Sequence, residues 1–291
     1  MNINEEILDD SQSTKVSFFQ KSETKCPVCH ENFYIEQMLS GGGRLNAGKL
    51  LSDLRREYQK SKKFGKLNPL IYSIIVCPHC YYATFPEDFK QIDEKTSEKL
   101  LKLKKTRFKY NELSFGNIDF NEKRTLLSGA SSYFLAILNY SYFDKKFSPT
   151  IKKAISSIRT SWIIKDLLKN AKFKNKNFDD LYIHFRILAE KLYTKVVEYS
   201  SSGKELIDNI KKFGPDNDKD YGYDGLIYLY AYLKYDLNKL ITDPTKQQEE
   251  MLKAKRALSK VFGIGKATKE KPGPLLDLSK DIYEEISKFT E

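Results

Sequence analysis

All four cysteines of this 291-residue sequence fall into two Cys-x-x-Cys pairs, Cys26 with Cys29 and Cys77 with Cys80. Two such pairs supply four thiolates, the number that a tetrahedral zinc ion takes in structural sites. Each pair can wrap a tight turn whose backbone amides point at the sulfurs, which lowers the thiol pKa and holds the metal. The sequence therefore predicts one zinc ion bound by Cys26, Cys29, Cys77 and Cys80.

The four thiolates form a closed ligand set, whereas a catalytic zinc ion normally keeps one coordination position for water. The metal is therefore interpreted as structural, joining the two ends of the insertion between the cysteine pairs. His30 and His79 adjoin the pairs and offer alternative ligands. The favoured interpretation places both imidazoles on the surface of the turns.

A redox function is the competing interpretation of the second pair. Cys-Pro-His-Cys at residues 77–80 is also the active-site tetrapeptide of some thioredoxin-fold proteins, in which a helix N-terminus lowers the pKa of the first thiol. Pro86 prevents a long helix from starting at this pair, and a second pair would be superfluous. A disulfide scaffold is less favoured still, because cysteine is scarce and no secretory signal precedes it.

Outside the cysteine pairs, residues of catalytic type are sparse. His184 lies on an expected helix and is interpreted as a partly buried structural histidine. Asp216, Asp218 and Asp220 have the spacing of a calcium loop, but the glutamate that such a loop needs at position 12 is missing. We therefore expect a protein that is not an enzyme.

The net charge of +11 raises the alternative of nucleic-acid binding. Lysines are spread along the whole chain, so a solvated surface is the favoured interpretation of any one group of them. Two clusters exceed this background and could contact phosphates. They are Arg44, Lys49, Arg55, Arg56, Lys60, Lys62, Lys63 and Lys66, and then Lys99, Lys102, Lys104, Lys105, Arg107 and Lys109.

The expected location is the cytoplasm. The sequence has no apolar stretch long enough to span a membrane. Its N-terminus is acidic and lacks the apolar region of a signal peptide. Paired, reduced cysteines fit a reducing compartment.

The elements that must position the cysteines divide the chain into three parts. Residues 1–24 are polar and are expected to form a flexible N-terminal segment. Residues 25–96 predict a zinc-ribbon-like domain, with a helical insertion at 48–61 and an apolar strand at 70–76. Residues 97–291 show the periodicity of successive amphipathic helices and predict a tetratricopeptide-like helical domain.

In the helical part, helices are expected at 97–110, 121–142, 148–172, 178–200, 224–241, 247–262 and 274–289. Pro149 suits the first turn of the third helix. Helices of this length with short connections form antiparallel α-hairpin arrays, and the aromatic-rich faces are compatible with degenerate tetratricopeptide repeats. The predicted fold class is mainly α, with a small zinc-ribbon-like α+β head followed by this antiparallel α-hairpin array.

Two groups of residues carry a resemblance to a known family over most of residues 25–290. The similarity in the head rests on Cys26-Pro27-Val28-Cys29, Phe33, Gly43-Arg44, Asp53, Tyr58, Asn68-Pro69-Leu70-Ile71-Tyr72, Val76-Cys77-Pro78-His79-Cys80-Tyr81-Tyr82-Ala83 and Phe89. Downstream it rests on Arg159-Thr160-Ser161-Trp162-Ile163-Ile164, Leu226-Ile227-Tyr228-Leu229 and Leu233. With these residues the chain resembles the bacterial domain-of-unknown-function 2225 family. The resemblance implies a zinc-ribbon-like head joined to a tetratricopeptide-like helical body, and it implies no known reaction.

These observations favour a non-enzymatic, zinc-binding scaffold or adaptor whose helical array binds a protein or peptide. The first alternative is a nucleic-acid-binding protein that uses the basic head. The less favoured alternative is a thiol–disulfide oxidoreductase.

Overall fold

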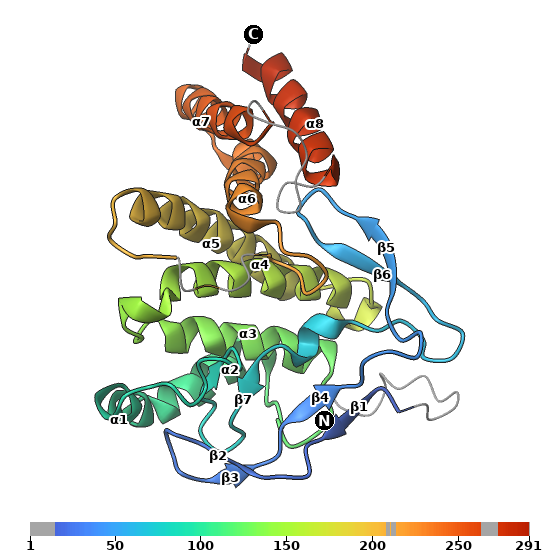
Figure 1. Cartoon of the computed structure of the whole chain (residues 1–291), viewed down its shortest axis with the longest axis vertical. Helices are drawn as coiled ribbons and strands as arrows, with labels where there is room; N and C mark the ends of the chain where they lie inside the picture. Colours follow the sequence, from blue (N-terminus) through green and yellow to red (C-terminus); the bar gives the residue numbers. More distant parts are fainter. Residues whose placement is uncertain (1–14, 208–209, 211–213, 263–272, 291) are drawn as a thin grey trace. The chain divides into compact units, whose positions relative to one another are not determined.

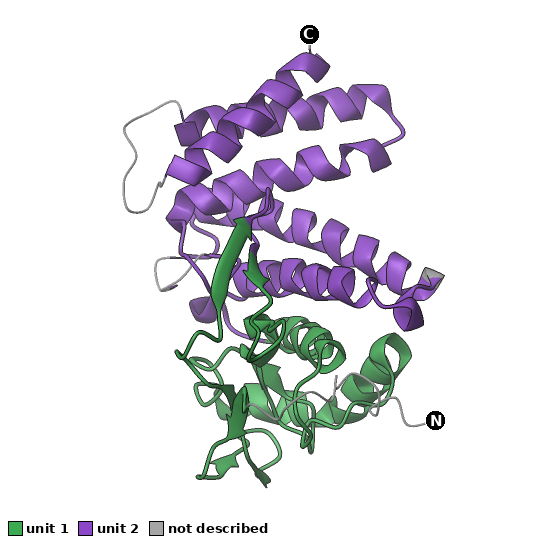
Figure 2. Ribbon diagram, turned by 90° about the vertical axis from the view of Figure 1, so that its right-hand side faces the viewer, with its two compact units in different colours: residues 1–49, 57–142 green, residues 50–56, 143–291 purple. Residues whose placement is uncertain are grey.

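The computed structural model in Figure 1 describes residues 15–207, 210, 214–262 and 273–290. Within these ranges, no helix combines the length and the apolar character needed to cross a membrane. The chain forms two compact units, which Figure 2 distinguishes by colour. Unit 1 consists of Met1–Lys49 and Glu57–Tyr142, and unit 2 of Leu50–Arg56 and Phe143–Glu291.

The strands of unit 1 form short two-stranded sheets. β1 (Ser17–Phe19) pairs antiparallel with β4 (Glu36–Met38), and β5 (Asn46–Leu50) pairs with β6 (Arg56–Gln59). β2 (Thr24–Lys25) pairs with β3 (Asn32–Phe33), and β7 (Ile75–Val76) with β8 (Ala83–Thr84). These last two hairpins contain the two cysteine pairs in their turns.

The segment 1–24, predicted to be flexible, lies partly outside the described residues, which begin at 15. From there on the backbone is structured: β1 pairs with β4, and the buried hydroxyl of Ser17 donates to the carboxylate of Glu36. The backbone is ordered here because the carboxylate of Glu36 satisfies the buried hydroxyl of Ser17.

Two predictions inside the head are wrong. Residues 48–61, whose apolar spacing predicts a helix, form the β5–β6 hairpin instead. Gly48 permits the close pairing, since a Cβ there would lie 2.9 Å from the carbonyl oxygen of Glu57. The first part of the strand predicted at 70–76 is the 3-10 helix η1 (Pro69–Tyr72), and only Ile75–Val76 form a strand. Asn68 caps η1 by accepting from the N–H of Leu70.

The helices of unit 1 are α1 (Glu94–Lys102), α2 (Lys104–Phe115) and α3 (Leu126–Tyr140). α3 starts at a capping box formed by Thr125 and Ser128, a few residues after the predicted start. Most of α3 is buried, and it packs on η1 and β8. Gly129 brings α3 against Ile71, because a Cβ at this glycine would lie 2.7 Å from the Cβ of Ile71.

Unit 2 is built mainly from five helices, α4 to α8, and each packs against the next one along the chain. Their bounds are α4 (Pro149–Leu167), α5 (Lys176–Ser201), α6 (Gly222–Leu237), α7 (Pro244–Phe262) and α8 (Gly273–Thr290). Short 3-10 helices lie between them or before them: η2 (Lys145–Phe147), η3 (Ala171–Phe173) and η4 (Asn238–Leu240). Pro149 is at the first turn of α4, as predicted.

The fold class is confirmed: the chain is mainly α, with a small α+β head. The tetratricopeptide-like character of the helices stays a prediction. So does the division into domains at residue 97, which rests on a change of sequence periodicity, whereas the compact units rest on contacts that keep α1, α2 and α3 in unit 1.

Candidate metal centre

The turns that hold the two cysteine pairs have the same backbone. In each, the first cysteine donates its N–H to the carbonyl five residues later, and its own carbonyl accepts the N–H four residues later. These distances are both 3.0 Å at Cys26, and 2.8 and 2.9 Å at Cys77. The residue after each second cysteine is in the left-handed region, with φ of 64° at His30 and 57° at Tyr81. Such a turn aims both cysteine side chains of a pair to one side.

The four sulfurs converge. The Sγ atoms of Cys26 and Cys80 are 3.7 Å apart, those of Cys29 and Cys77 are 3.6 Å apart, and all four lie within 4.8 Å of one another. A Zn–S bond of about 2.3 Å gives a tetrahedron whose sulfurs are about 3.8 Å apart. A disulfide would need about 2.05 Å, and all four thiols are free. The geometry fits a metal ion at the centre of the four sulfurs.

The protonation of this cluster also favours a bound cation. Cys26, Cys77 and Cys80 are fully buried. Hydrogen bonds from Cys77 and Cys80 lower the pKa of Cys26 to about 4, helped by the N–H of Val28, which lies 3.4 Å from its sulfur. The same bonding to Cys26 raises the pKa of Cys77 and of Cys80. Ionisation of Cys26 thus opposes ionisation of Cys77 and Cys80, and a bound cation would offset this repulsion.

Helices α1 and α2 bond directly to the two turns. From α1, the hydroxyl of Ser97 donates to the carbonyl of Pro27 at 2.6 Å. From α2, Nε and Nη2 of Arg107 both donate to the carbonyl of Cys80, at 3.0 and 2.8 Å. The ring of Phe108 stacks on that of Tyr81, with centroids 3.9 Å apart. The α1–α2 pair is therefore the outer support of the sulfur cluster.

The charge pattern placed Arg107 in a basic cluster, whereas the structure places it against the second cysteine turn. It belongs to the second basic cluster by sequence, yet it is only 2% exposed. Burial lowers its pKa, and the neighbouring cysteines oppose that effect. A better signal was its spacing from Asn111 and Phe115, which are buried on the same face of α2. Its cation lies beside a site that would have a net negative charge with four thiolates and one divalent ion.

The other predicted residues lie apart from the cluster. His30 and His79 are exposed, as predicted, and the ring of His79 meets the carbonyl of Asn32 at 3.2 Å. His184, predicted to be partly buried, is exposed on α5, so that prediction is wrong. Asp216 and Asp218 both bond to Arg56 at 2.8 Å, which explains these acids without a calcium ion.

The first basic cluster is divided between the two units. Arg55 and Arg56 lie in unit 2 and are ion-paired with Asp166 and Asp218. Arg44 in unit 1 stacks over the ring of Phe64 at 4.6 Å. The remaining members are exposed: Lys49, Lys60, Lys62, Lys63 and Lys66. Within this cluster, these five lysines are the exposed cations.

Replacing Arg107 with methionine is expected to weaken metal binding about 10- to 100-fold, the usual effect of removing a group that supports a ligand. The change keeps an unbranched side chain but removes the cation and both hydrogen bonds to Cys80. Competition with a chromophoric chelator measures the affinity. Arg159→Met is the matched control, because Arg159 is a buried arginine of unit 2 that donates to the carbonyl of Pro215. Equal affinities in the two variants would refute this role.

Comparison with known proteins gives a family and no activity. The model of a family described as "Uncharacterized protein conserved in bacteria (DUF2225)" matches residues 19–286. A protein of Borreliella burgdorferi (strain ATCC 35210 / DSM 4680 / CIP 102532 / B31), described as "Uncharacterized protein", is 41% identical over 274 residues, which are 94% of this chain and 97% of that protein. No solved structure matches the chain.

Proposed function

Because this chain belongs to the bacterial family DUF2225, whose description names no activity, we propose its function from its own geometry. The proposed function is that of a non-enzymatic scaffold or adaptor, in which one structural zinc ion holds unit 1 together and the helices of unit 2 bind a protein partner. The observation behind the zinc site is the convergence of four sulfurs within 4.8 Å in two matched turns.

The donor set supports zinc as the metal. Four thiolates in tetrahedral arrangement suit zinc or iron, and zinc adds no redox chemistry. Cys26, Cys29, Cys77 and Cys80 would hold the ion, and the bound ion would supply folding free energy to the surrounding turns. The ligand set leaves no position for water, which supports a structural and not a catalytic role. Free thiols of this kind also support a place in the cytoplasm.

The array of helices supports the scaffold part of the proposal. α4 to α8 pack in sequence order, and arrays built in this way present extended surfaces that bind proteins. The alternative is nucleic-acid binding by unit 1, and one observation favours it: five lysines of α1 and α2 are exposed, and so is Tyr110 on α2, at 47%. They are Lys99, Lys102, Lys104, Lys105 and Lys109.

A charge-reversal variant separates the two functions. Lys102→Glu, Lys105→Glu and Lys109→Glu together change only exposed positions. If the protein is a scaffold, a partner captured by cross-linking from its own cells is recovered equally with this variant and with the wild type. Recovery is followed near 0.15 M salt, where weak binding to exposed lysines is screened.

The control variant is Lys280→Glu with Lys288→Glu, two exposed lysines of α8 in unit 2. Tight binding of RNA or DNA at that salt, lost in the α1–α2 variant and retained in the α8 variant, would overturn the scaffold proposal. The reason is that phosphate contacts supply most of the affinity for nucleic acids and each lost cation removes counterion release.

A further inference from the structure

The turn between β5 and β6 is part of unit 2, although the residues on both sides of it belong to unit 1. The N–H of Leu51 donates to the carbonyl of Arg55 at 2.8 Å and closes the turn. Within it, Leu54 has a left-handed φ of 61° and is 0% exposed. A leucine in this conformation is strained, and such strain persists only where the surrounding packing fixes the backbone.

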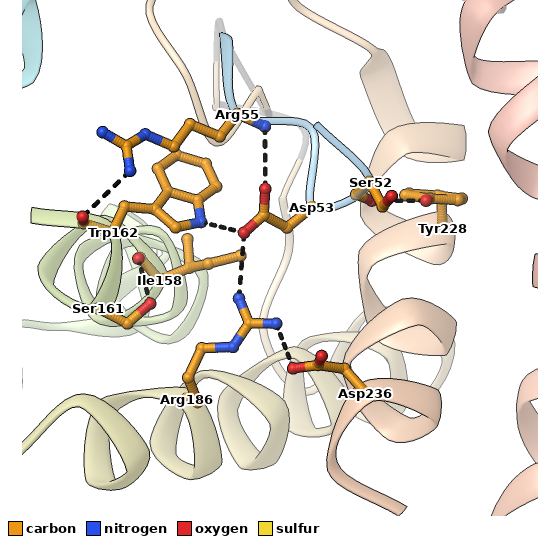
Figure 3. Close-up of polar contacts among 9 residues, drawn as sticks. All are labelled: Ser52, Asp53, Arg55, Ile158, Ser161, Trp162, Arg186, Tyr228 and Asp236. Atoms are coloured by element: carbon orange, nitrogen blue, oxygen red, sulfur yellow. Dashed lines mark hydrogen bonds and ion pairs between the residues drawn. The ribbon is translucent and has the colours of Figure 1, made fainter. Parts of the chain in front are cut away.

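Asp53 is held by two helices of unit 2, as Figure 3 shows. Its Oδ2 accepts from the indole Nε1 of Trp162 on α4 at 2.6 Å, and from Nη1 of Arg186 on α5 at 3.2 Å. Arg186 is 4% exposed in its side chain and also pairs with Asp236 on α6 at 2.5 Å. The carboxylate of Asp53 thus accepts hydrogen bonds from one neutral donor, the indole of Trp162, and from one buried cation, Arg186.

The two arginines that follow meet acids. Nη1 of Arg55 donates to the carbonyl of Trp162 at 3.1 Å, and its Nη2 pairs with Asp166. The backbone N–H of Arg56 donates to Asp216 and its Nε to Asp218, both at 2.8 Å. Each of the three charges of the segment therefore faces the opposite charge in unit 2.

The backbone and the apolar side chain of the turn are recognised as well. The hydroxyl of Tyr228 on α6 donates to the carbonyl of Ser52 at 2.5 Å (Figure 3). Leu54 reaches the helix beside Gly225, where a Cβ would lie 3.7 Å from its Cδ1 and 2.4 Å from the Cβ of Tyr221. The glycine is therefore needed for the close approach of Tyr221, and Leu54 packs beside it at ordinary contact distance.

We propose that this face of α4, α5 and α6 is a peptide-binding site for a turn of the type acidic–aliphatic–basic–basic. In this structure the chain's own residues 53–56 occupy it. The proposed protein partner enters the same site with an equivalent turn of its own. Oppositely charged pairs at positions 53, 55 and 56, around the apolar anchor Leu54, are a pattern of specific peptide recognition. The inference rests on the proposed scaffold function, because it names the chemistry of the partner.

A peptide in trans tests the proposal. In the full chain, residues 51–55 are replaced by Gly-Ser-Gly-Ser-Gly, which keeps the chain length and removes the bound side chains of Asp53, Leu54 and Arg55. The probe is a synthetic peptide with the sequence of residues 49–58. We expect the Tm of this linker variant to rise with peptide concentration, since a ligand that binds only the folded state stabilises it. The Tm of the wild type should stay constant, because its tethered turn has an effective concentration of the order of mM.

Two controls define the chemistry. A peptide with the Asp53→Asn change keeps an acceptor for Trp162 but loses the charge that Arg186 meets, so its affinity should fall at least about tenfold. Adding Trp162→Phe to the linker variant should weaken the native peptide by a similar factor, because the indole N–H is lost while the ring remains.

A milder variant covers the case in which the linker variant fails to fold. Asp53→Asn in the full chain leaves the backbone of the turn intact, and a labelled native peptide should then bind it measurably by fluorescence anisotropy. Absence of both the Tm rise and the anisotropy change at millimolar peptide overturns the peptide site. Zinc content and cross-linked partner recovery, measured on the wild type, report separately on the scaffold function.

Discussion

Replacing Cys77 with serine is expected to remove the metal and to unfold the part of unit 1 around the four sulfurs. Cys77 is fully buried, and three remaining thiolates do not complete a tetrahedral site. Zinc binding supplies about 10–16 kcal/mol in zinc-finger peptides, comparable with the whole stability of a small domain. Elemental analysis should find one zinc ion per wild-type chain and none in the variant. Hydrogen exchange should show lost protection in both cysteine turns, α1 and α2.

The control for this prediction is Val28→Ser. Val28 is buried inside the first cysteine turn, so the change introduces the same hydroxyl but keeps all four sulfurs. This variant is expected to lose some stability and to retain one zinc ion. Wild-type protein that contains no metal, or that contains two disulfides, would contradict the zinc centre; so would a Cys77→Ser variant with unchanged metal content and exchange.

Replacing Arg186 with methionine is expected to lower the free energy of unfolding of unit 2 by about 3–5 kcal/mol, the usual cost of breaking a buried ion pair from one side. Without this cation, the carboxylates of Asp53 and Asp236 have no shared counter-ion. Trp162 is the single tryptophan of the chain and bonds to Asp53, so its fluorescence during urea unfolding reports on this network directly.

A double-mutant cycle tests whether the effect belongs to the ion pair. Asp53→Asn combined with Arg186→Met should cost less than the sum of the two single changes, because the second change finds the interaction already lost. Lys288→Met is the surface control, since its partner Glu285 is also exposed, and the urea midpoint should not move. Strict additivity of the two buried changes would show that Asp53 and Arg186 are not coupled.

The sulfur cluster and the helices of unit 2 could be predicted because their signals are local or repetitive. Two Cys-x-x-Cys pairs identify four metal ligands without knowledge of the fold between them. The position of Pro149 predicted the start of α4. The β5–β6 hairpin could not be predicted from spacing, because Leu54 is buried through a left-handed turn and not through a helical face. Short apolar runs do not distinguish the two structures.

The features that the sequence could not predict depend on contacts between residues far apart along the chain. The carboxylate of Asp53 accepts a hydrogen bond from Trp162, which is 109 residues away along the chain. No sequence pattern around either residue predicts this contact. From the sequence, Arg107 could not be distinguished from the exposed lysines around it, because composition does not reveal that it is buried. The missed residues are thus buried charges, whose partners only the folded chain brings together.

Unit 2 combines an early segment of the chain, Leu50–Arg56, with the late segment that starts at Phe143, and this affects the order in which the newly made protein can fold. Every residue of unit 1 has left the ribosome soon after Tyr142 is made, whereas Asp53 bonds to Arg186 and Leu54 lies against Gly225, which are made later. At about 5–20 residues per second, synthesis of the intervening stretch takes on the order of 5–20 s. Through that interval the early turn exists without its late partners, so its charged and apolar side chains face water or a chaperone.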